Sequence, residues 1–190
     1  MARIPLPSPE ELNDAQRKVY DKIVGGKRGR IVGPLRAALL SPELADRWQA
    51  MGEFLRYNTS LTPRQSELAI LVTGRACGSP LEWHLHCAEA RKAGIEDSVI
   101  AALLHEQVPA TLSEQDLAIV RFARELNATN SVSDATYAQA LALFGATSVV
   151  ELTALIGYYT LVAMTLNAHE IPMPDGAAPA FPMPHEEAGA

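Results

Sequence analysis

Residues 77–94 read Cys-Gly-Ser-Pro-Leu-Glu-Trp-His-Leu-His-Cys-Ala-Glu-Ala-Arg-Lys-Ala-Gly. The break at Gly78-Ser79-Pro80 predicts the end of one helix and the start of the next, and Gly94 predicts where the second helix ends. This second helix brings several side chains that are common in active sites close together. They are Glu82, Trp83, His84, His86 and Cys87. We therefore expect any chemistry to take place here.

Start signals on both sides of this stretch divide the rest of the chain into helices. Ser or Thr followed by Pro or an acidic residue is typical of a helix start. No stretch shows the apolar and polar alternation of a strand. The sequence thus predicts an all-α fold with short connections. The expected elements are helices over about 9–24, 41–57, 62–77, 80–94, 96–104, 113–126, 133–143 and 148–168, with a short apolar segment at 35–40.

Apolar residues recur at helical spacing in two of these segments. Leu44, Trp48, Met51 and Leu55 are three or four residues apart, so we expect them to form the buried stripe of the 41–57 helix. The 148–168 helix has a longer apolar pattern, made of Leu152, Leu155, Ile156, Tyr159, Ala163 and Leu166. Both helices are therefore predicted to pack against a core.

The length of 190 residues and the 48% hydrophobic content suit one well-filled core. We expect a single helical domain over 1–170, with an extended arm at 1–9. The tail at 171–190 contains five prolines, which prevent a helix, so we expect it to be disordered or extended over a neighbouring surface.

Composition argues against several classes of protein. The net charge of −6 comes without a clustered basic stripe, so nucleic-acid binding is not expected. The N-terminal segment lacks the apolar region of a leader, and no uninterrupted apolar run approaches the roughly 20 residues that span a bilayer. We expect a soluble cytoplasmic protein without a membrane partner. The glycine-rich basic loop at 25–33 is interpreted as a solvated turn, with an anion site as the alternative.

A weak internal repeat relates two parts of the chain. Residues 67–70 read Glu-Leu-Ala-Ile and residues 116–119 read Asp-Leu-Ala-Ile. The helix that ends at Gly94 is likewise matched by one that ends at Gly145. The sequence therefore predicts two related helical hairpins.

Glu82 and His86 lie four residues apart, so their side chains project from one helix face about one turn apart. A carboxylate there orients the imidazole and raises its pKa, although surface ion pairs have the same spacing. Glu67, on the preceding helix, approaches both if the hairpin closes; otherwise it complements the helix dipole. Ser133 and Tyr137 stand at the corresponding places of the second hairpin, which we expect to be scaffold.

The two cysteines, Cys77 and Cys87, lack Cys-x-x-Cys spacing and are interpreted as reduced thiols. Beside a histidine, Cys87 is either an activated thiolate or a small packing residue. His84, His86 and Cys87 diverge around the helix, and the spacing that aims two imidazoles at one ion is absent. We expect no metal.

Two segments carry a resemblance to a known family. Leu-Thr-Pro-Arg-Gln-Ser-Glu-Leu-Ala-Ile-Leu at 61–71 and Leu-Glu-Trp-His-Leu-His-Cys-Ala-Glu-Ala-Arg-Lys-Ala-Gly-Ile at 81–95 resemble the carboxymuconolactone decarboxylase family, which includes the AhpD-type alkyl hydroperoxidases. Residues 33–36, 41–44 and 157–168 extend the likeness over most of the chain. The resemblance implies an AhpD-like helical bundle assembled as dimers, trimers or hexamers.

The resemblance also distinguishes two branches of the family. Its peroxidase branch has Cys-x-x-Cys, a histidine four residues later and an upstream glutamate. Placing that histidine on His86 puts Ser79 and Glu82 at the cysteine positions and Glu67 at the upstream glutamate. Without those thiols the disulfide cycle cannot run, so the pattern resembles the decarboxylase-like branch, which works without metal or organic cofactor.

We therefore expect a cofactor-independent lyase, decarboxylase or isomerase that transfers protons on a small carboxylate or lactone of aromatic-compound catabolism. The expected catalytic residues are His86, Glu82 and Glu67. Substrate-binding candidates are Arg36, Arg56 and Arg75 for a carboxylate, with Trp83 and Tyr159 as pocket walls. The alternatives are a thiol-dependent alkylhydroperoxidase-like antioxidant enzyme using Cys87, and a non-catalytic helical oligomer that binds a small ligand.

Overall fold

The structure is a computed structural model that describes residues 2–31, 33–109, 111–174 and 176–184. Every regular element in these ranges is helical, which confirms the all-α expectation. A 3₁₀ turn at Pro9–Glu11 is followed by α1 (Asp14–Gly25), α2 (Pro34–Ala38), α3 (Pro42–Tyr57), α4 (Pro63–Ala76), α5 (Pro80–Lys92), α6 (Asp97–Leu104), α7 (Glu114–Thr129) and α8 (Asp134–Ala168).

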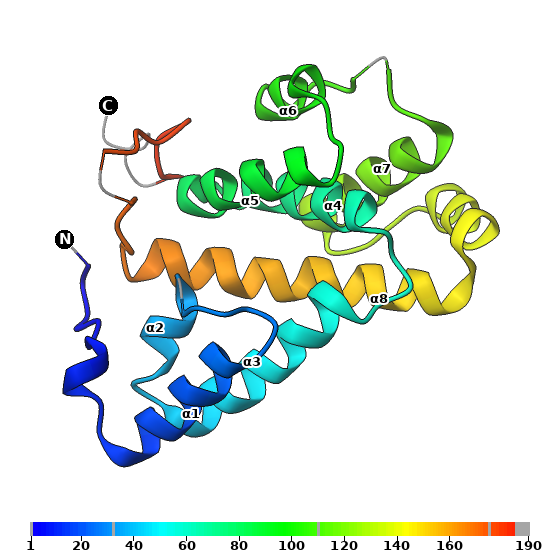
Figure 1. Cartoon of the computed structure of the whole chain (residues 1–190). Helices are drawn as coiled ribbons and strands as arrows, with labels where there is room; N and C mark the ends of the chain where they lie inside the picture. Colours follow the sequence, from blue (N-terminus) through cyan, green and yellow to red (C-terminus); the bar gives the residue numbers. More distant parts are fainter. Residues whose placement is uncertain (1, 32, 110, 175, 185–190) are drawn as a thin grey trace.

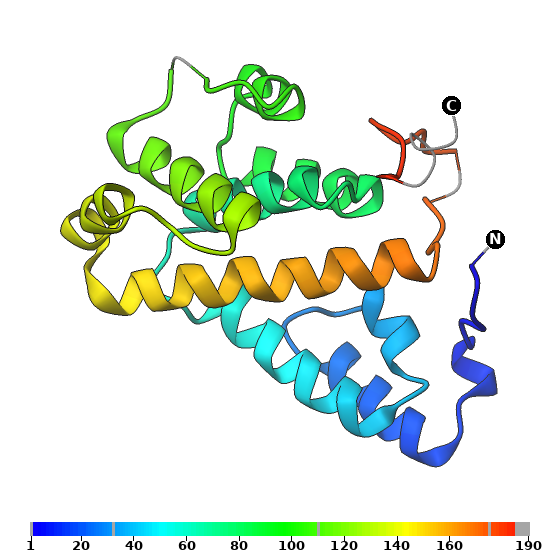
Figure 2. The ribbon, with the colours of Figure 1, turned by 180° about the vertical axis from the view of Figure 1, so that it is seen from behind.

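Helix α8 runs through the middle of the molecule (Figure 1). Helices α4–α7 lie on one side of it and α1–α3 on the other, and the view from behind agrees (Figure 2). Helix α4 is buried along residues 65–74 and packs against α5, α7 and α8. The two helix groups therefore meet along α8, and a site between them draws residues from both.

The turn between α4 and α5 follows from its sequence. Gly78 has a φ of 57°, a left-handed conformation that glycine adopts at little cost. Pro80 then occupies the first turn of α5, where its missing N–H is tolerated. A Cβ on Gly74 would lie 3.4 Å from the Cγ of Glu82, so this glycine lets α5 approach α4 closely. The predicted hairpin forms, and it brings Glu82 against α4.

The helix expected over 9–24 is interrupted in the structure. Only Pro9–Glu11 forms a 3₁₀ turn, and α1 begins at Asp14. Asn13 accepts a hydrogen bond from the Gln16 backbone N–H at 3.0 Å, which caps a new helix instead of continuing the first turn. The expectation of one continuous helix was therefore wrong.

The stripe expected on the 41–57 helix is half wrong. Trp48 and Leu55 are buried, but Leu44 and Met51 are 52% and 49% exposed. Small residues such as Ala45 and Gly52 complete the buried face of α3. Periodicity counted only large apolar side chains and so placed the stripe off the true contact face.

Helix α8 contains both of the last two expected helices. Gly145 has non-helical φ and ψ of 76° and 167° and kinks the chain between them. By length and composition alone, α8 is long and apolar enough to cross a membrane, with a hydropathy of 1.8. The expectation concerned uninterrupted apolar runs, and α8 contains Glu151 and several polar residues, so the two statements are compatible. A core helix of a soluble protein passes the same test, and α8 packs against α2, α3, α4, α5 and α7.

The tail is extended where the structure describes it. Ile171, Met173 and Phe181 pack against the hydrophobic core. Residues 175 and 185–190 of the expected tail lie outside the described residues. The ordered part thus covers the end of the molecule where α5 begins and α8 ends (Figure 1).

Candidate functional site

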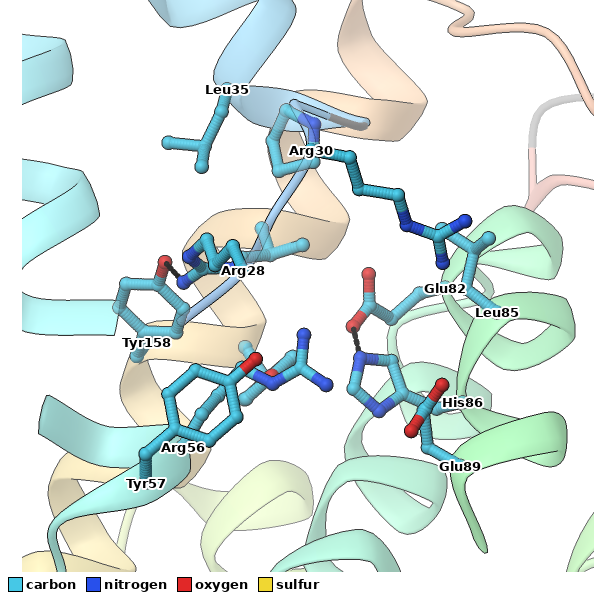
Figure 3. Close-up of a pocket in the computed structure, with 13 residues that line it drawn as sticks. Arg28, Arg30, Leu35, Arg56, Tyr57, Glu82, Leu85, His86, Glu89 and Tyr158 are labelled. Carbon is cyan, nitrogen blue, oxygen red and sulfur yellow. Dashed lines mark hydrogen bonds and ion pairs between the residues drawn. The ribbon is translucent and has the colours of Figure 1, made fainter. Parts of the chain in front are cut away.

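A cavity of about 160 Å³ opens where the two helix groups meet. Its walls come from the loop after α1, from α2, from the end of α3 and from α5 and α8 (Figure 3). The lining residues are Arg28, Arg30, Pro34, Leu35, Arg56, Tyr57, Glu82, Leu85, His86, Glu89, Tyr158, Tyr159 and Val162.

His86 is held between two carboxylates on the α4–α5 side of this cavity. Its Nδ1 lies 2.7 Å from Glu67 Oε2, and its Nε2 lies 3.1 Å from Glu82 Oε1. The exposed fractions are 6% for His86, 2% for Glu82 and 8% for Glu67. The surface ion pair that the Glu82–His86 spacing also allowed is therefore not what the fold makes.

The two contacts of the imidazole differ in quality. The contact with Glu67 is a hydrogen bond, whereas the contact with Glu82 has ion-pair distance without hydrogen-bond alignment. Glu82 Oε1 is thus a buried acceptor with hydrogen-bonding capacity to spare. Glu82 as a residue also lines the cavity, while its Oε1 atom is itself buried beside His86.

The charges fix the protonation state of the ring. Burial disfavours the imidazolium, but the nearby carboxylates, Glu67 first and Glu82 second, outweigh it and raise the pKa of His86 to about 9. The ring of Tyr159 meets the imidazole edge-on, with centroids 5.0 Å apart. Burial raises the pKa of the Tyr159 phenol well above its usual value. At neutral pH the site holds a positively charged imidazole beside a neutral phenol.

Three arginines line the same cavity without a carboxylate partner among the described ion pairs. Arg28 donates only a long hydrogen bond, 3.5 Å, to the Tyr158 hydroxyl, and its Nε is buried without a partner. Figure 3 shows Arg28 and Arg56 across the cavity from His86, and Arg30 on the side of Glu82. Guanidinium groups in this state are suited to bind an anion.

The sequence-predicted residues are partly brought together. His86, Glu82, Arg56 and Tyr159 line the cavity. Glu67 contacts the Nδ1 atom of His86 and does not line this cavity. It lines a neighbouring cavity, which Arg56 also lines.

The remaining three candidates lie elsewhere. Arg36 donates to the Leu6 carbonyl at 3.0 Å, and Arg75 donates to the Leu104 carbonyl at 2.9 Å. Trp83 is buried and meets the ring of Phe181 instead of the cavity. None of the three lines the candidate site.

Sequence reasoning did not select Arg28 and Arg30. Both belong to the basic loop that was interpreted as a solvated turn, and the structure places them at the cavity. The available signal was the alternation of glycine with basic residues over 25–33. The alternative interpretation, an anion site, is the one that this placement favours.

The cysteines lie outside the cavity lining. Burial raises the pKa of the Cys87 thiol to about 11 and also raises that of Cys77. Both therefore remain thiols at neutral pH, which does not favour the activated-thiolate interpretation. Within the described ranges, the His, Cys, Asp and Glu side chains form no group of three that suits a metal ion.

Comparisons with known proteins give a family match over part of the chain and a shared fold. Residues 42–125 match the model of the carboxymuconolactone decarboxylase family, which confirms the resemblance expected from the sequence. No curated protein sequence matches the chain.

Solved structures share the fold at low identity. An uncharacterized peroxidase-related protein from Ralstonia eutropha JMP134, described as an AhpD core, is 19% identical, with 92% of this chain and 93% of that chain covered and a TM-score of 0.75. Another peroxidase-related protein, from Silicibacter sp. TM1040, is 16% identical, with 92% of each chain covered and a TM-score of 0.76. A Cys-to-Ala variant of the debrominase Bmp8, in complex with 2,3,4-tribromopyrrole, is 11% identical, with 92% and 95% covered and a TM-score of 0.71.

Proposed function

From the match of residues 42–125 to the carboxymuconolactone decarboxylase family, we propose that this protein is a cofactor-independent enzyme that transfers protons on a small carboxylate or lactone. The observation that carries the proposal is the buried His86 between two carboxylates, beside a cavity whose three arginines have no carboxylate partner among the described ion pairs. Decarboxylation and double-bond migration are the reactions that this arrangement suits.

Protonation decides the roles within the cluster. With a pKa of about 9, His86 is an imidazolium at neutral pH and acts as the proton donor. Glu82 lines the cavity beside His86, and in this proposal its carboxylate takes a proton from a substrate carbon. Glu67 holds the other ring nitrogen and fixes the orientation of the imidazole.

Both reactions leave an electron pair that the site must manage. In isomerisation, Glu82 removes a proton next to the carbonyl, the electron pair delocalises into the carbonyl, and His86 returns a proton at another carbon. In decarboxylation, the carbon–carbon bond breaks, carbon dioxide leaves with no proton removed, and only the protonation by His86 is needed. The guanidinium groups of Arg28, Arg30 and Arg56 neutralise the negative charge on the substrate and on the enolate.

Solvent deuterium tests this proposal directly. Unsaturated lactone acids are incubated with the protein in deuterated water, and NMR follows deuterium at the carbon next to the carbonyl together with carbon dioxide release. We expect His86→Ala and Glu82→Gln to lower turnover by at least a hundredfold. His84→Ala is the matched control, because His84 is exposed on the same helix. Full turnover in both cluster variants would show that the assigned roles are wrong.

The other two candidate functions receive less support. Cys87 stays protonated and lies outside the cavity, which disfavours the thiol-dependent antioxidant enzyme. Neighbours described as peroxidase-related proteins and as a debrominase show that this fold is compatible with different chemistries. A binding protein without catalysis would return its ligand unaltered and without deuterium in the same experiment.

We also propose that the chain forms a homo-oligomer through the outer face of α8. Val150, Leu161 and Met164 on this face are 67%, 46% and 63% exposed. Exposed apolar residues at this spacing are typical of a subunit contact. Light scattering should give a multiple of the 20.5 kDa chain mass, and Leu161→Glu should lower it.

A further inference from the structure

The two ends of the chain carry one four-residue pattern three times. It reads Ile-Pro-Leu-Pro at 4–7, Ile-Pro-Met-Pro at 171–174 and Phe-Pro-Met-Pro at 181–184; we call these segments the proline straps. In each strap the two apolar residues other than proline are partly buried. Proline keeps such a segment extended, where alternate side chains point to opposite sides. Each strap therefore presents a short apolar row to the body of the protein.

The first two straps are held in place by polar contacts. The Arg36 guanidinium donates to the Leu6 carbonyl at 3.0 Å and fixes the N-terminal strap. The Arg3 backbone N–H donates to the His169 carbonyl at 2.9 Å, and the Arg3 side chain pairs with Glu170 at 2.5 Å. The N-terminal strap is thus tied to the segment from which the next strap begins.

The last strap is held by aromatic contacts. Phe181 meets Trp83 edge-on with centroids 6.0 Å apart, and the Arg75 guanidinium lies 4.9 Å from the Phe181 ring centre. Pro184 packs on Gly78, where a Cβ would come within 2.5 Å of its ring. Arg36, Arg75 and Trp83, which the sequence offered as substrate ligands, thus position the straps.

A cavity of about 330 Å³ lies beneath the first two straps, with Arg36 among its mostly apolar lining residues. Its walls include Leu6, Ile31, Leu81, Leu85, Ile171 and Met173. A second cavity of about 330 Å³ shares Leu81, Ile171 and Met173 with it and continues beneath the last strap. We call this pair of cavities the strap annex.

The strap annex adjoins the candidate site through one wall. Leu85 of α5 lines both the strap annex and the arginine-lined cavity. In the loop before α2, Arg30 lines the candidate site while its neighbour Ile31 lines the strap annex. The two cavities are therefore adjacent, with Leu85 between them, and a molecule that reaches Arg30 with its charged end enters the strap annex past the Leu85 side chain.

From this shared wall we infer that the site takes an amphiphilic carboxylate, with its head at the arginines and an unbranched alkyl chain of medium length in the strap annex. The inference rests on the proposed function only for the position of the carboxylate. Arg30 has no ion-pair partner among the described contacts. The carboxylate of the ligand would therefore form an ion pair with its guanidinium group. The alkyl chain gains affinity by leaving water for an apolar wall.

Calorimetric titration with a series of acids tests the inference. Butanoate, hexanoate and octanoate are compared with octan-1-ol at neutral pH. Because each buried methylene contributes about 0.8 kcal/mol at most, we expect up to about fourfold tighter binding per methylene and at least tenfold from butanoate to octanoate. We expect octan-1-ol to bind at least tenfold more weakly than octanoate, because it lacks the charge.

Substitutions at Met173 and Arg30 distinguish the contribution of the alkyl chain to affinity from that of the carboxylate. Met173→Gln should weaken the dependence of affinity on chain length, and Met173→Asp should remove this dependence. Arg30→Gln should abolish the preference for octanoate over octan-1-ol but keep the chain-length dependence. Met51→Gln is the control, since Met51 is exposed on α3 and lines neither the candidate site nor the strap annex. Circular dichroism verifies that each variant is folded.

Repeating the calorimetric titrations with the three acids on His86→Ala separates ligand binding from catalysis. Affinity that rises with chain length there supports the strap annex, even if deuterium exchange fails and the proposed function is wrong. Equal affinity for all three acids in the wild-type protein, or an unchanged series in folded Met173→Asp, would overturn the inference.

Discussion

The α4–α5 hairpin and the hairpin formed by α7 and the first part of α8 begin with nearly the same sequence but bury different groups. Glu67 and Asp116 stand at matching places, each followed by Leu-Ala-Ile, and they are 8% and 7% exposed. Glu67 pairs with the buried His86 at 2.7 Å, whereas Asp116 pairs at 3.0 Å with Arg64, whose side chain is 25% exposed. One acid therefore belongs to a buried cluster and the other to a surface network.

The positions of the partners explain this difference. His86 is 6% exposed, while Tyr137 at the matching place is 45% exposed. Ser133, opposite Glu82 in the comparison, accepts a hydrogen bond from the Thr136 N–H and serves as a helix cap. Similar helix signals thus build two scaffolds, and burial of the second helix face makes only one of them a candidate for chemistry.

Removal of His86 should break this contrast most strongly. His86→Ala leaves Glu67 and Glu82 buried without their cation, and breaking a buried pair in this way costs about 3–5 kcal/mol. Urea unfolding at neutral pH measures the loss. Tyr137→Ala is the matched control and should change the free energy of unfolding by less than about 0.5 kcal/mol. Equal losses in both variants would mean that the buried cluster has no special role in stability.

The pH dependence of stability should sharpen the contrast next. The pKa of His86 in the folded protein, about 9, lies above the unfolded value near 6.5. Its stabilising contribution is therefore complete below about pH 6.5 and is lost as the pH rises through about 9, a change of about 3 kcal/mol. Unfolding titrations from pH 6 to 10 on wild type and His86→Ala give the difference. A constant difference over that range would contradict the raised pKa.

Much of the fold followed from local signals, because prolines and caps act within one turn. The starts of α3, α4 and α5 were predicted from Pro42, Pro63 and Pro80, and the Glu82–His86 pair followed from helical spacing. Arg28 and Arg30 were missed because a loop reaches a cavity through tertiary packing, which no local period encodes. The strap annex depends in the same way on segments more than 160 residues apart, as the contacts of Arg3 with Ala168 and His169 illustrate.

A change at Asp116 should have a smaller effect than any change at the buried cluster. Asp116→Asn weakens the pair with Arg64, but Arg64 keeps its contacts with Glu96 at 2.9 Å and with the Gly94 carbonyl. We expect a loss of about 1 kcal/mol in the free energy of unfolding, because the pair is partly solvated. The loss should shrink in 1 M salt, where surface charges are screened. Glu67→Gln is the comparison, and its loss should be larger and less sensitive to salt.

The smallest effect on stability should come from Tyr137→His, which introduces an imidazole into the second hairpin at the position that matches His86. Tyr137→His places an imidazole where the native side chain is 45% exposed and where the described contacts supply no pair of buried carboxylates. We expect the free energy of unfolding to change by less than about 0.5 kcal/mol, and the new imidazole to titrate near its ordinary pKa of about 6.5. NMR titration resolves this ring from His86, whose pKa is about 9. If the new ring also titrated near 9, the helix pattern itself would raise the pKa, and burial between two acids would not be the cause.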